Sequence, residues 1–260
     1  MRPFDFLKLS LIVFMGLEIL SCAQPKSGLS SLQRQQLVSI NSAMQTLDVA
    51  IAKAFDGSEK SGDGRTERLA RQIVAGQCQQ RLQKPRKDFA TSWSGSELVQ
   101  SERCPLYLSR HWTFDASQSL WSFHQDLLVR NPTFAEISGI RSFDLEGSLT
   151  ARHPKESETV VQGSVNYSDF VVSGVGHIEA KVDVYQFYGE ERGRGSAELT
   201  MSVGRQAYVA RIEWLVDKLG GTEVRHFIND SNVDPREFDE AFSSFGLDEI
   251  MAKSLQMRYL

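Results

Sequence analysis

The sequence predicts an α+β protein, a curved antiparallel β-meander of about six to nine strands with N-terminal and C-terminal helices packed on its apolar face. Three observations support this prediction. Apolar residues recur at helical spacing before residue 83 and after residue 234, they alternate with polar residues between about 104 and 228, and short turns separate the alternating runs. Because strands joined by short turns are antiparallel and have one apolar face, that face needs a cover.

The first predicted elements are two helices, at about residues 33–55 and 66–83. In the first helix, apolar side chains recur at spacings of three and four residues and so form one stripe. The stripe comprises Leu37, Ile40, Met44, Leu47, Ile51 and Ala54. The second helix is expected to begin at Thr66, which can cap it, and to stop before Pro85.

The predicted sheet covers about residues 104–228, where the apolar period is two, as in half-buried strands. The alternation is regular at residues 143–151, 161–167, 178–184, 197–203 and 208–216. Turn residues such as Ser173-Gly174 and Gly204-Arg205 separate successive strands. The runs 106–114, 121–129 and 134–140 are predicted as further strands, with poorer alternation.

A second helical pair is predicted at about residues 235–257. Asp234 can cap its first helix, Pro235 suits the first helical position, and Gly246 can end it. We expect both helical pairs to cover the sheet; a closed barrel or a sandwich is the alternative architecture. Small residues on the inward side of the strands would let a helix approach closely and would equally leave space for a ligand. They are Gly147, Ala151, Gly163, Ala180, Ala197 and Ala210.

The N-terminus has the layout of an export signal, with a short apolar block at residues 9–17 behind two basic residues. This block is shorter than the roughly 20 apolar residues that cross a bilayer and matches the apolar region of a cleavable signal peptide. It is followed by Ile19-Leu20-Ser21-Cys22, which resembles the lipobox of bacterial lipoproteins, whose cysteine becomes diacylated.

This resemblance implies that residues 1–21 are a lipoprotein signal peptide, that residues 22–31 are the lipidated Cys22 and a flexible tether, and that residues 32–260 form a single α+β domain. It places the protein in the bacterial cell envelope, bound to a membrane through its lipid anchor and facing the periplasm or the exterior. Ala23 after the cysteine favours the outer membrane, by resemblance to the sorting of enterobacterial lipoproteins. An ordinary signal peptide cut nearby and an anchor helix that is never cut are the alternatives.

The other two cysteines, Cys78 and Cys104, form an even pair in an oxidising compartment once Cys22 carries lipid. A Cys78–Cys104 disulfide is therefore predicted. A cysteine nucleophile or a metal-binding pair is disfavoured, because the sequence has no Cys-x-x-Cys motif.

Charge and missing motifs exclude several classes of function. The formal net charge is −4, from 29 Lys and Arg against 33 Asp and Glu, so the chain lacks the basic field that nucleic-acid binding needs. It contains neither a His-Glu-x-x-His zinc motif nor a Gly-x-Ser-x-Gly nucleophile motif. We therefore expect no metal site, no cofactor, no catalytic residue and no enzymatic activity.

The function favoured by these observations is non-enzymatic binding of an apolar ligand or an envelope protein. The outline resembles the lipoprotein-carrier proteins, half-barrels closed by helices, although no motif of that family is matched. The candidate ligand-facing residues are the inward aromatic side chains Phe143, Tyr167, Tyr208 and Trp214. Alternatively, these residues fill a dry core and the protein is a structural or surface-interaction lipoprotein; a periplasmic enzyme is a third hypothesis.

Overall fold

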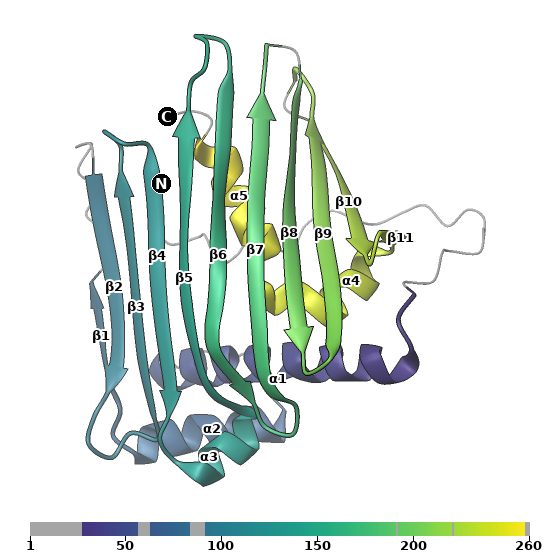
Figure 1. Cartoon of the computed structure of the whole chain (residues 1–260). Helices are drawn as coiled ribbons and strands as arrows, with labels where there is room; N and C mark the ends of the chain where they lie inside the picture. Colours follow the sequence, from purple (N-terminus) through teal and green to yellow (C-terminus); the bar gives the residue numbers. More distant parts are fainter. Residues whose placement is uncertain (1–27, 57–62, 84–91, 191, 220, 258–260) are drawn as a thin grey trace.

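The computed structural model describes residues 28–56, 63–83, 92–190, 192–219 and 221–257 (Figure 1). Its strands form one sheet in which each strand pairs antiparallel with its sequence neighbours, in the order β1 to β11. The strands are β1 (Gln79–Gln83), β2 (Ser92–Gln100), β3 (Leu106–Asp115), β4 (Leu120–Val129), β5 (Ile140–Arg152), β6 (Thr159–Val172), β7 (Gly176–Tyr188), β8 (Gly193–Val203), β9 (Gln206–Val216), β10 (Thr222–Ile228) and β11 (Ser231–Val233). The helices are α1 (Ser31–Asp56), α2 (Gly64–Ala75), α3 (Pro132–Ser138), α4 (Pro235–Phe242), the short 3-10 helix η2 (Ser243–Phe245) and α5 (Leu247–Met257).

The predicted α+β class, the antiparallel sheet and the helices at both ends are confirmed. The predicted number of about six to nine strands is wrong, since the sheet has 11. Two of the additional strands, β1 and β2, precede Cys104, where no regular alternation is visible in the sequence. β1 is an edge strand with mostly exposed polar side chains, so no buried face imposes a period of two on it.

The second predicted helix ends at Ala75, not at residue 83, because the chain turns there into β1. The N–H of Gly76 donates to the carbonyl of Gln72 and closes the helix, and Gln77 then takes a left-handed φ of 51°. At the start of α2, the carboxylate of Asp63 accepts hydrogen bonds from two backbone N–H groups, so Asp63 caps the helix and Thr66 is its third residue.

The strand predicted at residues 134–140 is also wrong, because Pro132–Ser138 form helix α3. The side chain of Asn131 accepts a hydrogen bond from the N–H of Phe134, and Pro132 occupies the first turn, where its missing N–H costs nothing. Gly139 ends the helix with a φ of 80°. In a segment this short, the capping residues are a better guide than the apolar period.

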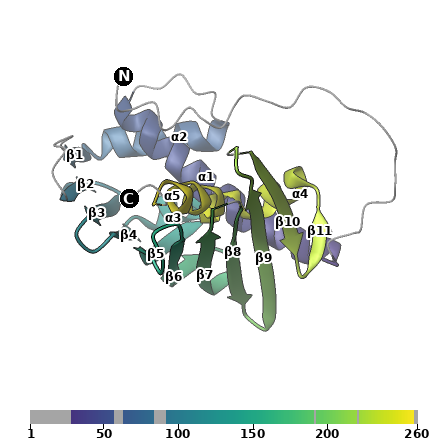
Figure 2. The same ribbon diagram turned by 90° about the horizontal axis from the view of Figure 1, so that it is seen from above.

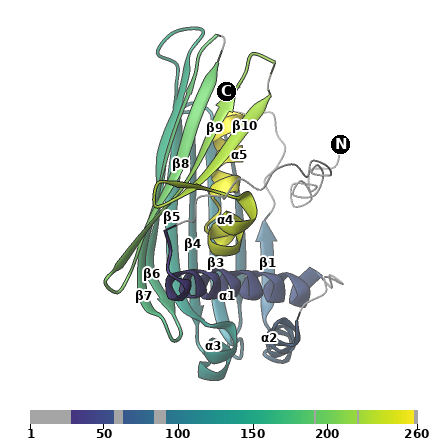
Figure 3. The same ribbon diagram turned by 90° about the vertical axis from the view of Figure 1, so that its right-hand side faces the viewer.

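The sheet is curved, and helices α1, α4 and α5 lie inside the curve (Figure 2). Seen from the side, the strands wrap around these helices (Figure 3). α1 crosses the strands near one end of the sheet, whereas α5 contacts β6, β7 and β8 further along the strands. We call the side of the sheet that faces these helices the concave face.

The end of the concave face near α1 holds a close-packed core. The apolar stripe of α1 is buried there, with Leu37 and Ile40 fully inaccessible to solvent. Asn41 fixes α1 to the C-terminal helices, because its amide Nδ2 donates to the carbonyls of Asp239 and Glu240 at 3.0 and 2.9 Å. Its Oδ1 accepts from the N–H of Ser244 at 2.7 Å. Helices from opposite ends of the chain are thus joined by hydrogen bonds as well as apolar contacts.

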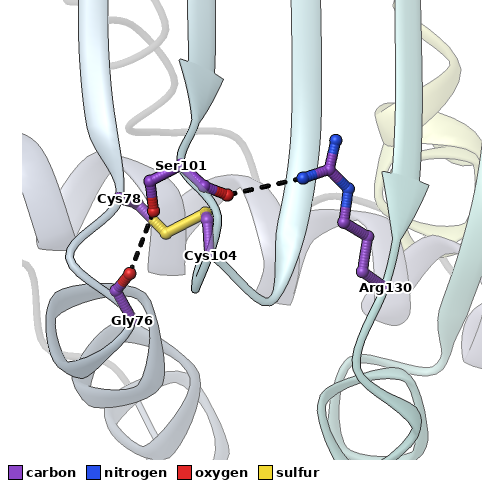
Figure 4. The surroundings of a disulfide bond; sticks show 5 residues. All are labelled: Gly76, Cys78, Ser101, Cys104 and Arg130. Atoms are coloured by element: carbon purple, nitrogen blue, oxygen red, sulfur yellow. Dashed lines mark hydrogen bonds between the residues drawn. A yellow bond between two sulfur atoms is a disulfide. The ribbon is translucent and has the colours of Figure 1, made fainter.

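The predicted disulfide is confirmed: Cys78 and Cys104 are joined, with their Cα atoms 4.8 Å apart (Figure 4). The bond links the segment after α2 to the turn before β3. Next to it, the hydroxyl of Ser101 donates to the carbonyl of Gly76, and the carbonyl of Ser101 accepts from Arg130. This junction holds α2 against the first strands of the sheet.

The predicted signal peptide, Cys22 and the tether up to residue 27 lie outside the described residues. Among the helices of the described part, none has the length and apolarity needed to cross a bilayer.

Candidate ligand-binding site

The four predicted ligand-facing side chains all lie on the concave face, and all are buried. Three of them hold other elements in place. The hydroxyl of Tyr167 donates to the carbonyl of Phe245 at 3.0 Å, and burial raises the pKa of this phenol. The hydroxyl of Tyr208 donates to Oε1 of Gln36 in α1 at 3.1 Å, and the ring of Phe143 meets Phe170 edge to face, with centroids 5.9 Å apart. The fourth, Trp214, is 1% exposed.

Four other aromatic side chains on the concave face, in β3 and β4, remain half-buried. Trp112 and Phe114 pair across the strands with Phe123 and Trp121. They share a face with the fully buried Leu108, because side chains two residues apart point the same way along a strand. All four rings are half-buried, and the centroids of Trp121 and Phe123 are 4.5 Å apart. We call these four residues the aromatic surface.

Two glycines leave space for two rings of the aromatic surface to lie flat on the sheet. Gly95 is the cross-strand partner of Trp112, and a Cβ at Gly95 would sit 2.5 Å from the indole ring. Gly147 is the partner of Phe123, and a Cβ there would sit 2.6 Å from the phenyl ring. Each ring therefore occupies the space that a side chain would take and lies over the backbone of the next strand. Rings in this position project less into the curve of the sheet than upright rings would.

A partly buried charge cluster of Arg110, Asp48 and Glu97 separates the aromatic surface from the core near α1. Arg110, between Leu108 and Trp112 on the same face, contacts Asp48 of α1 at 2.9 Å and Glu97 of β2 at 3.1 Å. Burial opposes the charge of Arg110, but the two carboxylates outweigh it, and the pKa of the guanidinium is raised. Because two carboxylates already meet this cation, it offers little attraction to an anionic ligand.

A cavity of about 850 Å³ lies at the other side of the sheet, where β7, β8, β9 and β10 reach their ends. Gly193 and Val216 line it from the concave face. The alternation of the strands puts two further lining residues, Phe187 and Leu215, on the opposite face, so the cavity spans the rim of the sheet. None of the four predicted ligand-facing residues lines it.

Acidic, histidine and cysteine side chains do not gather into a metal-binding group of three or more within the described ranges.

The aromatic surface was not predicted from the sequence, although a signal for it is present there. Trp112 and Phe114 alternate with Thr113, and Trp121 and Phe123 alternate with Ser122, as expected for strands with one aromatic face. The glycines opposite these rings could not be assigned, because their pairing depends on the register between strands.

Comparisons with models of protein families, with curated proteins and with solved structures gave no match for this chain.

Proposed function

We propose that the protein is a non-enzymatic lipoprotein of the bacterial envelope that binds an apolar ligand on its aromatic surface. The observation that carries this proposal is that Trp112, Phe114, Trp121 and Phe123 stay half-buried inside the curve of the sheet. Aromatic side chains bring large apolar areas to a binding site at a small cost in side-chain entropy. An apolar ligand would remove the remaining exposed ring surface from water.

The surroundings of the aromatic surface favour an uncharged ligand. Arg110 is the nearest cation along β3, and its charge is met by Asp48 and Glu97. Lys253 of α5 lies 6.0 Å from the ring of Trp121 and so engages the same surface through a cation–π contact. The long side chain of this lysine belongs to a helix that covers the sheet, so ligand binding would be sensitive to the position of α5.

The anchoring part of the proposal comes from the sequence around Cys22. A diacylated cysteine at this position would hold the domain close to a membrane, since two acyl chains anchor stably where one does not. α1 begins at Ser31, so only a short tether would separate the lipid from the domain. Ala23 supports the outer membrane as the location.

Native mass spectrometry of the protein purified from its own cells tests the anchor and the ligand together. We expect a chain that starts at Cys22 and carries a diacyl modification, with a non-covalent apolar ligand as an additional mass. An unmodified Cys22 would contradict the anchor. If the protein never carries a ligand and binds no apolar probe, the structural or surface-interaction lipoprotein is the better description.

Replacing one ring of the aromatic surface tests the ligand site directly. We expect the apolar fluorescent probe N-phenyl-1-naphthylamine to bind, and Trp121→Ala to weaken its binding by about fivefold or more, because the largest ring of β4 is lost. The matched control is Tyr185→Ala in β7, which removes an exposed ring from the opposite face of the sheet. Equal probe binding by Trp121→Ala and the unmodified chain would place the site elsewhere.

A further inference from the structure

The cavity of about 850 Å³ at the ends of β7, β8, β9 and β10, which we call the rim cavity, is lined by two arginine side chains. Arg194 is the second residue of β8, and Arg192 precedes that strand. Both side chains are exposed, and within the described part of the chain neither guanidinium has an ion pair or a hydrogen bond. The hairpins β7–β8 and β9–β10 end side by side at this edge of the sheet (Figure 1), so a ligand reaches both arginines from solvent.

The two acidic side chains that line the rim cavity already have partners. Oε1 of Glu223 accepts a hydrogen bond from Nε of Arg225 at 2.9 Å and lies 2.8 Å from its Nη2. Oδ1 of Asp217 accepts from the backbone N–H groups of Leu219 and Gly221, at 2.8 and 2.7 Å. With Arg225 included, three guanidinium groups stand against two carboxylates, so the cavity attracts an anion. Guanidinium groups bind carboxylates and phosphates through paired N–H donors.

Arg194 lies between two apolar side chains of the lining, on the face of the sheet opposite the concave face. Cross-strand pairing puts Phe187 of β7 and Leu215 of β9 directly beside Arg194. Leu215 is 47% exposed, so the cavity offers apolar surface next to a cation. The carboxylate in this row, Glu223, is one strand further away, beside Leu215. A ligand with an acidic group next to an apolar body matches this order of side chains.

We propose that the rim cavity binds a small anionic amphiphile, whose acidic group contacts Arg192 and Arg194 and whose apolar body lies on Phe187 and Leu215. The volume of the cavity is in the range of small-molecule sites. A neutral amphiphile would leave the two guanidinium groups without a partner, and a free inorganic anion would leave the apolar lining in water. Both should therefore bind more weakly than a molecule that combines the two parts.

This site goes beyond the proposed function, because it uses no residue of the aromatic surface and takes a charged ligand. The two sites lie on different strands, β3 and β4 for the aromatic surface and β7 to β10 for the rim cavity. Variants of one site therefore serve as controls for the other.

Two fluorescent probes that differ by one acidic group test the proposal on the purified full chain. The probe 1-anilinonaphthalene-8-sulfonate has the rings of N-phenyl-1-naphthylamine and carries a sulfonate in addition. We expect the double variant Arg192→Gln, Arg194→Gln to bind the sulfonate probe about tenfold more weakly and to bind the uncharged probe as before.

The matched control is Arg205→Gln, which removes an exposed arginine from the turn at the other end of β8 and β9. This control should leave the affinity for both probes unchanged. Equal weakening by Arg205→Gln, or an unchanged affinity of the double variant for the sulfonate probe, would overturn the proposal. Thermal unfolding verifies that the variants fold, since exposed side chains at the strand ends should not alter the midpoint.

Displacement of the bound sulfonate probe by octanoate and by acetate tests the apolar part of the site. Both competitors carry a carboxylate, but only octanoate has a chain that reaches Phe187 and Leu215. We expect octanoate to displace the probe at a concentration at least about tenfold lower, and Leu215→Ala to reduce this advantage. Equal displacement by the two competitors would show a site for small anions only and would refute the amphiphile.

The same measurements separate this proposal from the proposed function. Trp121→Ala should weaken the binding of the uncharged probe and leave the effect of the arginine variant on the sulfonate probe in place. If only Trp121→Ala alters probe binding, the proposed function stands and the rim site does not. If only the arginine variant alters it, the rim site stands and the aromatic surface is not the site of the uncharged ligand.

Discussion

The two ends of strand β3 differ in burial although their side chains lie on the same concave face. Near α1, Leu108 is fully buried and pairs with Leu127, which is almost fully buried. Further along β3, past Arg110, the side chains of Trp112 and Phe114 are only half-buried. The same alternation puts all of them on one face, so the pattern of apolar residues alone does not distinguish core from surface. The two ends of β3 differ in what covers them, because α1 lies over the end that holds Leu108.

The residues opposite the rings are the second difference. Bulky partners such as Val99 face Leu108, whereas glycines face Trp112 and Phe123. Bulky partners make the first end a close-packed core. Glycine partners let the rings of Trp112 and Phe123 lie over the strand backbone, whereas Trp121 faces the buried Leu149. How a side chain packs on this face therefore depends on its cross-strand neighbours as well as on the helix above it.

The largest expected effect is a difference in the free energy of unfolding between a variant in the core near α1 and a variant in the aromatic surface. Leu108→Ala leaves a cavity in the core and should lower the free energy of unfolding by about 2–5 kcal/mol. Trp121→Ala removes a larger side chain, but from a half-buried position, and should lower it by less. Denaturant unfolding of both variants measures the difference. A larger loss for Trp121→Ala would show that the aromatic surface is part of the core.

The disulfide tests whether the first strands depend on a covalent link. Replacing Cys78 and Cys104 together by alanine opens a loop with a sequence separation of 26 residues. In the chain-entropy model this should lower the free energy of unfolding by about 3 kcal/mol. Thermal unfolding of the double variant under non-reducing conditions gives the value. The reference is the unmodified chain after reduction, which should lose a similar amount of stability.

Gly95→Ala addresses the aromatic surface itself. The new methyl group would meet the Trp112 ring at 2.5 Å, so the ring must move away from β2. We expect a loss of about 1–3 kcal/mol in stability, together with weaker binding of the apolar probe. Gly64→Ala is the control, because a Cβ at that position meets nothing within 4 Å. Unchanged probe binding by Gly95→Ala would mean that the position of the ring does not matter to the ligand.

The parts of the fold that were predictable from sequence are those in which one face of one element is buried. The α1 stripe, the Asp234 cap and the strands between residues 143 and 216 all follow from local spacing. β1 was missed because an exposed edge strand has no apolar period, and α3 because its caps outweighed a misleading alternation. The aromatic surface depends on which strands pair and in what register, and the local spacing of apolar residues does not give that register.

The smallest expected effect concerns α4, a C-terminal helix inside the curve of the sheet. It carries a partly buried carboxyl group, whereas the buried stripe of α1 is apolar. Burial raises the pKa of Asp239 in α4, the nearby charge of Asp248 raises it further, and His226 opposes the shift. Since the pKa of Asp239 is higher in the folded protein than in the unfolded chain, the folded state binds more protons. Stability therefore falls as the pH rises from the unfolded pKa of this carboxyl group to its folded pKa.

Asp239→Asn removes this titration. The variant should therefore be slightly more stable than the unmodified chain at neutral pH, and the gain should vanish at acidic pH, where Asp239 is protonated in the folded state. Thermal unfolding of both proteins between pH 4 and 8 measures the difference, with Asp183→Asn on the opposite face as the control. A gain that is independent of pH would attribute the effect to something other than the charge of Asp239. A gain that appears only at neutral pH would show that the helical cover over the sheet is held less tightly when this carboxylate is ionised.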